Sequence, residues 1–237
     1  MYTKKQYTDD ELIRRVWDIE EIKKLVYKRG VYIANDWRRR ELDELWVREP
    51  EHCRTASFGK NIGWYVGMDA IRAWYEKTHG AGYLAFHPAT TGLVELAGDG
   101  KTAKGLFYSI AQETEPNGDG TARALWMPEK IGFDFVKEGG EWKIWHFVAA
   151  VDLTCEAGTD YEAQDCYPHY EADPVMLEFG TPTVPCLTHD GTFNWWDNYP
   201  AMPQPYDTFT DDISYGPEGF KPIPGLYLRG GEGRNYQ

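Results

Sequence analysis

The stretch YLAFHPATTGLVELAGDGKTAKG, residues 83–105, decides the fold. The run TGLVELAG reads as a β-strand, the dipeptide Asp99-Gly100 favours a tight turn, and a second strand-like run follows. A single histidine, His87, stands shortly before the first of these strands. The stretch therefore predicts an antiparallel hairpin, with His87 either at the mouth of a pocket or at the edge of a sheet.

A second hairpin follows. The run ALWMPEKIGFDFVKE, residues 124–138, turns at Gly139-Gly140 into EWKIWHFVAAV, residues 141–151. Helical patterns precede both hairpins, and this order is typical of an α+β domain with a curved, mostly antiparallel sheet.

The alternation along this hairpin predicts which side chains face inward. One face of its last strand carries alternate residues, namely Trp142, Ile144, His146 and Val148. His146 is therefore expected to point inward if Trp142 and Ile144 do. Asp134 lies on the face opposite Phe133 and Phe135. Either Asp134 faces inward as a catalytic candidate, or the two phenylalanines line the core; we favour the second arrangement.

Three helices are predicted before the hairpins. In the first, within residues 9–36, apolar residues recur at spacings of three and four, at Leu12, Val16, Ile19, Ile22 and Val26. This pattern fits one amphipathic helix or two pieces. Residues 38–46 predict a short second helix, and residues 67–79 a third, with Asp69 as its expected N-cap.

Composition excludes several classes of function. The chain has 237 residues, a net charge of −13 and an estimated pI of 4.9. This charge repels nucleic-acid phosphates and anionic membranes, so neither is an expected partner. We see no signal peptide and no apolar run of about 18 residues, so a cytoplasmic protein is expected.

The chain has four cysteines, Cys53, Cys155, Cys166 and Cys186. They form no CxxC pair, so we predict free thiols and no structural zinc site.

The chain changes character near residue 150. Ten of the fourteen prolines lie after this point, together with many aromatic residues. Such proline density excludes long helices and central strands, but a disordered tail is usually poor in aromatics. We therefore predict a domain over residues 1–150 and an irregular extension over residues 151–237, packed on the domain or on a neighbouring subunit.

Four segments resemble the SnoaL-like branch of the nuclear-transport-factor-two-like superfamily. They are IEEIKKLVYKRGVYIAND (19–36), YVGMDAIRAWY (65–75), the His87 stretch, and DFVKEGGEWKIWHF (134–147). The resemblance covers residues from about 15 to 150. It implies a cone-shaped α+β barrel with an apolar pocket at its open end. Members include scytalone dehydratase, ketosteroid isomerase, polyketide cyclases and bile-acid dehydratases, while others have no enzymatic role.

The resemblance also implies site residues. Several dehydratases of the superfamily use an Asp on the first helix and a His before the hairpin, which correspond here to Asp36 and His87. Asn35 competes with Asp36 for this position, and with Asn35 no carboxylate would support His87, which argues against a proton-transfer dyad. A histidine near neutral pKa can act as acid or base, and a neighbouring carboxylate fixes its tautomer. Tyr32 or His146 would stabilise developing charge on a substrate oxygen.

The sequence thus predicts a cofactor-independent lyase or isomerase, foremost a dehydratase. Its substrate would be a small hydrophobic hydroxylated molecule, polycyclic or aromatic, and these residues would contact it: Trp64, Phe107, Tyr108 and Trp126. We find no P-loop, no dinucleotide fingerprint, no GxSxG and no HExxH, so no cofactor or metal is expected. The alternative is a non-catalytic binding or assembly protein that uses the same pocket. A homo-oligomer, dimer or trimer, is expected, with the extension at the interface or acting as a lid.

Overall fold

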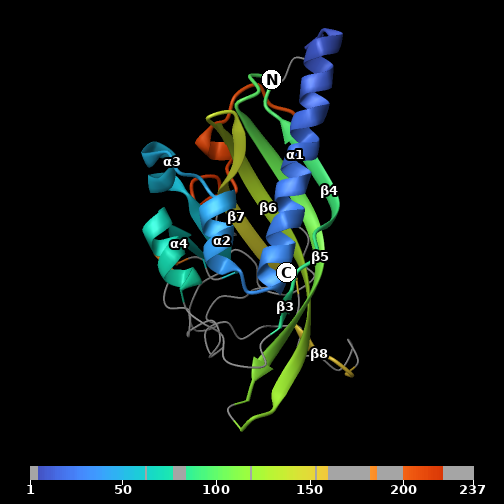
Figure 1. Cartoon of the computed structure of the whole chain (residues 1–237), viewed down its shortest axis with the longest axis vertical. Helices are drawn as coiled ribbons and strands as arrows, with labels where there is room; N and C mark the ends of the chain where they lie inside the picture. The colour runs from blue at the N-terminus through green and yellow to red at the C-terminus, as the bar shows by residue number, and fades with distance from the viewer. Residues whose placement is uncertain are drawn as a thin grey trace, which may run out of the picture.

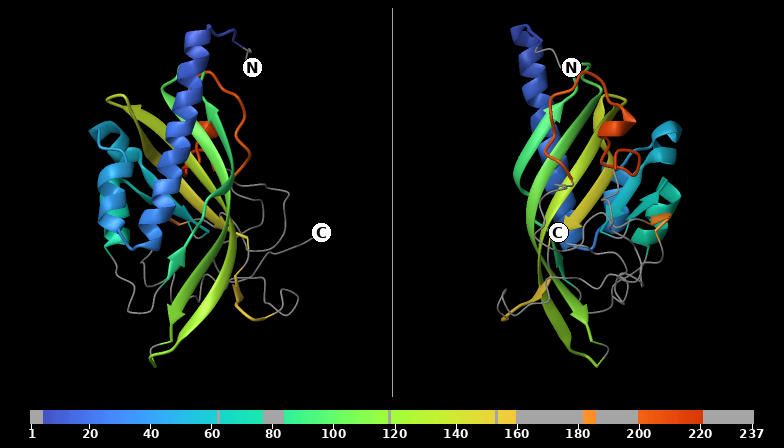
Figure 2. Two further views of the ribbon diagram at one scale, coloured as in Figure 1. Left: turned by 45° about the vertical axis from the view of Figure 1, so that its right-hand side comes forward. Right: turned by 180° about the vertical axis from the view of Figure 1, so that it is seen from behind.

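One curved, open sheet with helices on one face forms the body of the molecule (Figures 1 and 2). The structure is a computed structural model and describes residues 5–61, 63–76, 84–117, 119–152, 154–159, 182–185 and 200–220. The predicted α+β class is confirmed, although the sheet does not close. Most of the predicted extension lies outside the described residues.

The long helix α1 spans Asp9–Ala34 as one continuous element. Thr8 and Glu11 start it with a capping box, in which each side chain accepts a hydrogen bond from the backbone N–H of the other. Its first turns extend past the sheet (Figure 1). The buried positions follow helical spacing and are Ile22, Leu25, Val26, Arg29 and Tyr32. This face carries a buried cation, Arg29, into the interior.

In the described part of the chain, three short helices lie with α1 in the helical layer: α2 (Arg38–Leu45), α3 (Pro50–Thr55) and α4 (Met68–Tyr75). Helix α3 was not predicted, because six residues are too few to show a helical period. The predicted cap of α4 is wrong: Gly67 is its N-cap, and Asp69 lies in the first turn. An acid in the first turn still interacts favourably with the helix dipole.

Within the described residues the sheet has nine strands, in the order β3-β5-β6-β7-β1-β2-β9, with β4 also paired to β5 and β8 to β6. The strands are β1 (Ser57–Lys60), β2 (Gly63–Val66), β3 (Ala85–Phe86), β4 (Thr90–Leu96), β5 (Thr102–Pro116), β6 (Ala122–Glu138), β7 (Glu141–Val151), β8 (Cys155–Glu156) and β9 (Val184–Pro185). Both predicted hairpins are present, as β4–β5 and β6–β7. Since β8 and β9 lie beyond residue 150, parts of the predicted extension join the same sheet.

A β-bulge in β7 reverses the predicted direction of His146. The register between β6 and β7 shifts after the Asp134–His146 pair, which leaves Trp145 as the extra residue. Trp142 and Ile144 lie in the core, whereas His146 lies on the opposite face beside Asp134. The expectation that these three residues share one face is wrong, because alternation in a sequence does not reveal a bulge.

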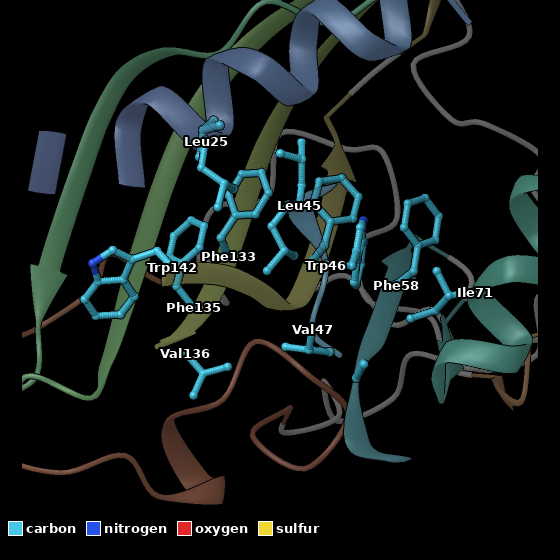
Figure 3. Close-up of a cluster of buried hydrophobic side chains, with 14 of the residues drawn as sticks. Leu25, Leu45, Trp46, Val47, Phe58, Ile71, Phe133, Phe135, Val136 and Trp142 are labelled. Atoms are coloured by element: carbon cyan, nitrogen blue, oxygen red, sulfur yellow. The ribbon is translucent and has the colours of Figure 1, made fainter. Parts of the chain in front are cut away.

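The hydrophobic core lies between the helices and the sheet. Figure 3 shows Leu25 of α1, Trp46 after α2, and Phe133 and Phe135 of β6 gathered in it. Phe133 and Phe135 stack with ring centroids 5.3 Å apart. The favoured arrangement is therefore the observed one: these rings face the core, and Asp134 points away.

Residues 200–220 cover the face of the sheet that is opposite α1 (Figure 2). Gly98 N–H donates to Tyr206 O at 2.8 Å, and Asp99 N–H donates to Asp207 O at 2.9 Å. A short 3-10 helix, Asp211–Ile213, follows. Because of this cover, charged residues on the outer face of the sheet are buried.

Candidate active site

His87 lies between β3 and β4, close to α1. A Cβ added to Gly30 would lie 3.3 Å from the carbonyl oxygen of His87, so the absent side chain permits this approach. His87 is 8 % exposed. The sheet edge and the helix together hold the imidazole in the interior.

Two glutamates on neighbouring strands bind His87. Its Nδ1 lies 2.8 Å from Glu129 Oε1 on β6, and its Nε2 lies 2.7 Å from Glu113 Oε1 on β5. An imidazolium donates from both nitrogens, and carboxylates only accept, so this geometry fits a protonated His87. Glu129 is 1 % exposed, and its Oε2 has no hydrogen-bond partner among the described residues.

The charge of His87 follows from these partners. Burial alone lowers the pKa of a histidine, but the charge of Glu129 and the hydrogen bonds to both glutamates outweigh it and raise the pKa of His87 to about 9. His87 is therefore an imidazolium at neutral pH. A protonated histidine beside carboxylates can donate a proton and take one back, which is the basis of general acid–base chemistry.

A partly enclosed cavity borders these groups. The centre of a water molecule can occupy a volume of about 50 Å³ within this cavity. This is enough room for roughly three to five water molecules. Its aromatic lining comes from β1, α4 and β7, as Phe58, Trp74, Tyr75 and Phe147. Phe58 lies 4.3 Å from Trp74 and 5.0 Å from Phe147 between ring centroids. The cavity thus suits a small, flat, apolar group that carries a few polar atoms.

Arg29 also lines the cavity, from the buried face of α1. Its Nε lies 3.0 Å from Glu41 Oε1, and its guanidinium carbon lies 3.9 Å from the centroid of the Phe147 ring. The same Glu41 oxygen accepts hydrogen bonds from Tyr75 OH at 2.6 Å and Trp46 Nε1 at 3.4 Å. Burial is the largest single effect and lowers the pKa of Arg29, but Glu41, Tyr75 and Glu129 together outweigh it and keep the arginine pKa above its ordinary value.

The residues predicted on α1 lie elsewhere. Asp36 is exposed, adopts φ 55° and pairs with Arg38 at 2.6 Å. Asn35 is also exposed, and its side-chain amide donates to Val31 O at 2.8 Å. Neither residue is among those described at the cavity. Glu113 and Glu129, rather than Asp36, are the carboxylates at His87.

Tyr32 is buried but points toward α2. Its hydroxyl donates to Glu44 Oε2 at 2.5 Å, and its ring lies 5.9 Å from that of Trp37. Hydrogen bonding to Glu44 raises the pKa of Tyr32. The tyrosine that shares a wall with His87 is Tyr75 of α4.

His146 lies on the outer face of the sheet. Its Nδ1 is 2.9 Å from Ser57 Oγ, and burial lowers its pKa to about 4. Beside it, Lys104 Nζ pairs with Asp134 Oδ1 and donates to the carbonyl of Ile213. Asp134 Oδ2 accepts from Tyr215 N–H at 2.6 Å. These residues are separated from the His87 cavity by the sheet.

The four predicted substrate contacts do not converge. Trp64 Nε1 donates to Tyr215 O at 3.2 Å, beneath residues 200–220. Phe107 lies in the core against Phe133, Tyr108 is exposed, and Trp126 pairs with Gln112 in the β5–β6 hairpin. None of the four is among the described residues that line the cavity.

Sequence reasoning missed Glu113 and Glu129, yet a signal for both exists. On β5 the alternation from Phe107 through Ser109 and Ala111 reaches Glu113, and on β6 the alternation from Phe133 back through Ile131 reaches Glu129. An acid in register with an apolar face is an unusual residue there, since an unpaired buried carboxylate is costly. Extending the two alternations along their strands would have found both.

One exposed group of residues could hold a cation. Glu49, Glu51 and His52 bring their ligand atoms within 4.8 Å of one another at the start of α3. His52 Nδ1, however, already lies 2.7 Å from Glu138 Oε1. Exposed acids of this kind are common on protein surfaces, and the group lies apart from the cavity.

The comparisons place the chain in a family. A family model described as the SnoaL-like domain matches residues 14–148, more than half of the chain. The chain belongs to the SnoaL-like family. The match includes Arg29, His87, Glu113 and Glu129 of this SnoaL-like protein, and the resemblance predicted from the four sequence segments is confirmed. No curated protein sequence matches the chain.

Solved structures with a similar fold are distant in sequence. An NTF2-like protein with a cystatin-like fold from Novosphingobium aromaticivorans is 16% identical, with a TM-score of 0.44 over 65% of the SnoaL-like chain and 91% of its own. A candidate scytalone dehydratase from the same organism is 12% identical, with a TM-score of 0.49 over 62% and 91%. A hexachlorocyclohexane dehydrochlorinase from Novosphingobium barchaimii is 12% identical, with a TM-score of 0.49 over 65% and 98%.

None of the helices in the described part of the chain has both the length and the apolar character needed to cross a membrane.

Proposed function

We propose that the protein is a cofactor-independent carbon–oxygen lyase that removes water from a small hydroxylated molecule. The observation that carries the proposal is His87, bonded through both ring nitrogens to Glu113 and Glu129 at the wall of the cavity. Membership of the SnoaL-like family supports it. Elimination of water needs a base for a C–H proton and an acid for the leaving hydroxyl, and this cluster supplies both.

Glu129 is the base in this proposal. Its Oε1 accepts from His87, while its Oε2 has no hydrogen-bond partner among the described residues and can take the C–H proton of a substrate. Its burial among apolar groups keeps competing water away from the carboxylate.

His87 is the acid. At neutral pH its raised pKa keeps both nitrogens protonated. A substrate hydroxyl takes the place of Glu113 at Nε2, receives the Nε2 proton and leaves as water. Nδ1 keeps its proton and its 2.8 Å hydrogen bond to Glu129 throughout. After the products leave, Glu129 gives its proton to water that enters the cavity, and Nε2 takes up a proton from this water, which restores the starting state. One proton leaves the substrate carbon and one reaches the hydroxyl, so the cycle balances.

The size of the cavity limits the substrate. About 50 Å³ is too little for the fused rings of a steroid-like molecule, so a single ring or a short chain is the better candidate. The aromatic wall of Phe58, Trp74 and Phe147 favours a flat apolar body.

The test is a dehydration screen with matched variants. Small aromatic and aliphatic alcohols are incubated with the protein, and mass spectrometry detects the loss of one water. Glu129→Gln and His87→Gln should each reduce the rate by about 10² to 10⁴. His52→Gln is the control, because it removes a second His–Glu hydrogen bond of 2.7 Å outside the cavity. Equal rates for wild type and Glu129→Gln would contradict the proposal, as would a panel that is never dehydrated.

A second candidate is a small-molecule-binding protein without catalysis. The hydrogen bonds of both His87 ring nitrogens to Glu129 and Glu113 favour this role, because a histidine with a purely structural role would make the same bonds. In that case ligands would stabilise the fold without being converted. Thermal shifts unaccompanied by loss of water would identify this role.

A further inference from the structure

A buried cation shares the cavity wall with the acid–base cluster. Arg29 is 6 % exposed, lies on α1, and lines the same cavity as His87 and Glu129. A buried arginine is stabilising only when its surroundings compensate the loss of hydration. In this protein the compensation comes from Glu41 and from the ring of Phe147.

The contacts of Arg29 hold it in place at the wall of the cavity. Its Nε lies 3.0 Å from Glu41 Oε1, but within the described part of the chain this nitrogen has no aligned hydrogen-bond partner. A guanidinium offers five N–H donors in a rigid plane. Glu41 is itself fixed by Tyr75 and Trp46, and the Phe147 ring supports the guanidinium at 3.9 Å. The arginine is thus oriented in advance, and its positive charge is fixed at the cavity wall.

The charges of the lining favour an oxygen that gains negative charge. Arg29, Arg38, Lys60 and protonated His87 line the cavity with two carboxylates, Glu113 and Glu129. Removal of a C–H proton by a carboxylate is feasible when the carbon lies beside a carbonyl, because the electron pair moves onto the carbonyl oxygen. A fixed cation stabilises that oxygen more strongly as its charge develops.

We infer that Arg29 binds the carbonyl oxygen of the substrate, and that the substrate is a small β-hydroxy carbonyl compound. The inference rests on the proposed function. Glu129 takes the proton from the carbon beside the carbonyl, and the electron pair of that bond forms an enolate on the oxygen held by Arg29. The enolate pair then forms the C=C bond while the C–O bond breaks, and the departing hydroxide takes the His87 proton to become water.

The test uses binding, because binding does not depend on turnover. Para-fluorophenol is the probe: its ionised form places a charged oxygen on a flat ring, as an enolate does, and fluorine NMR distinguishes the ionised from the neutral form. Para-fluoroanisole is the matched probe that cannot ionise. The wild-type chain should bind fluorophenol in its ionised form near neutral pH, and about ten to a hundred times more tightly than fluoroanisole.

Arg29→Lys keeps the charge and should retain part of this preference. Arg29→Met/Glu41→Gln removes the ion pair together, so that no unpaired carboxylate charge remains, and should abolish the preference. Arg15→Met is the control, since Arg15 lies on the same helix and donates only to the backbone oxygens of Leu96 and Ala97 in the contacts described. Fluorophenol binding that is unchanged in the double variant would overturn the inference, as would equal binding of both probes or no binding of either.

The two proposals fail differently. Glu129→Gln should stop dehydration but leave ionised fluorophenol bound. If fluorophenol binding depends on Arg29 but no member of the panel is dehydrated, Arg29 binds a charged oxygen as proposed, and the proposed lyase activity is refuted. Dehydration of alcohols that lack a carbonyl, at rates unaffected by Arg29→Lys, would keep the lyase and refute the oxygen site.

Discussion

Two histidines on opposite faces of one sheet have opposite charge behaviour. His87 lies on the inner side between two glutamates, and its pKa is raised to about 9. His146 lies on the outer side, bonded to the neutral hydroxyl of Ser57, and burial lowers its pKa to about 4. Both are almost fully buried, so exposure does not explain the difference. The partners do: carboxylates stabilise the imidazolium, and a hydroxyl does not.

The buried charged groups beside His146 and those beside His87 also differ in their hydrogen-bond partners. On the outer face, the Lys104–Asp134 pair is capped by Ile213 O and Tyr215 N–H from residues 200–220. On the inner face, Glu129 Oε2 has no hydrogen-bond partner in the described part of the chain, and the cavity lies beside it. The first arrangement holds a segment onto the sheet, and the second leaves groups able to act on a ligand. This difference makes the inner cluster the functional candidate.

The largest expected effect belongs to the outer cluster. Asp134→Ala should reduce the free energy of unfolding by about 3–5 kcal/mol, because it leaves Lys104 buried and unpaired. Urea unfolding measures the change. Asp207→Ala, which removes a half-exposed partner of Lys5 at 3.8 Å, should cost less than about 1 kcal/mol. Equal losses in the two variants would show that the buried pair does not stabilise the fold.

The inner histidine should give stability that depends on pH. The folded pKa of His87, about 9, exceeds the ordinary value of 6.5. Its contribution, about 3 kcal/mol, is therefore complete below pH 6.5 and is lost as the pH rises toward 9. Urea unfolding between these pH values should show the loss in wild type and not in His87→Gln. A wild-type profile that is flat over this range would refute the raised pKa.

The outer histidine should give the opposite dependence. Because its folded pKa is about 4, neutral His146 contributes stability above pH 6.5 that is lost as the pH falls toward 4. His146→Asn should remove this part of the acid sensitivity while leaving the loss above pH 6.5 in place. An unchanged acid profile in His146→Asn would mean that other groups set the low-pH limit.

The smallest effect concerns the approach of α1 to His87. Gly30→Ala gains about 1 kcal/mol of helix propensity, but its Cβ would lie 3.3 Å from His87 O. The net change in unfolding free energy should stay within about 1 kcal/mol, while the NMR signals of His87 move and those of His146 do not. Movement of both sets, or of neither, would contradict the close contact.

Local patterns predicted most of the fold. The hairpin turns at Asp99-Gly100 and Gly139-Gly140 and the apolar spacing of α1 are signals between residues close in the sequence. The bulge at Trp145 left no such signal, so the direction of His146 was wrong.

The site was only partly predictable. His87 stands out as a lone histidine before a strand, but its partners lie 26 and 42 residues further along the chain. The register of three neighbouring strands decides which acids lie beside the imidazole. This register can be predicted from a sequence only when the turns and bulges are known. The family pattern directed attention to Asp36, whereas in this chain the helix has ended before that residue.

The measurement that tests the account most directly is an NMR titration of isotope-labelled histidine, with His87→Gln and His146→Asn to assign the signals. We expect the His87 ring to stay protonated through neutral pH and to titrate at about 9, and we expect the Glu129→Gln variant to lower this pKa. We also expect His146 to stay neutral down to about 4. A His87 that titrates near 6.5 in both proteins would contradict the account, because the imidazole would then not be held between two carboxylates.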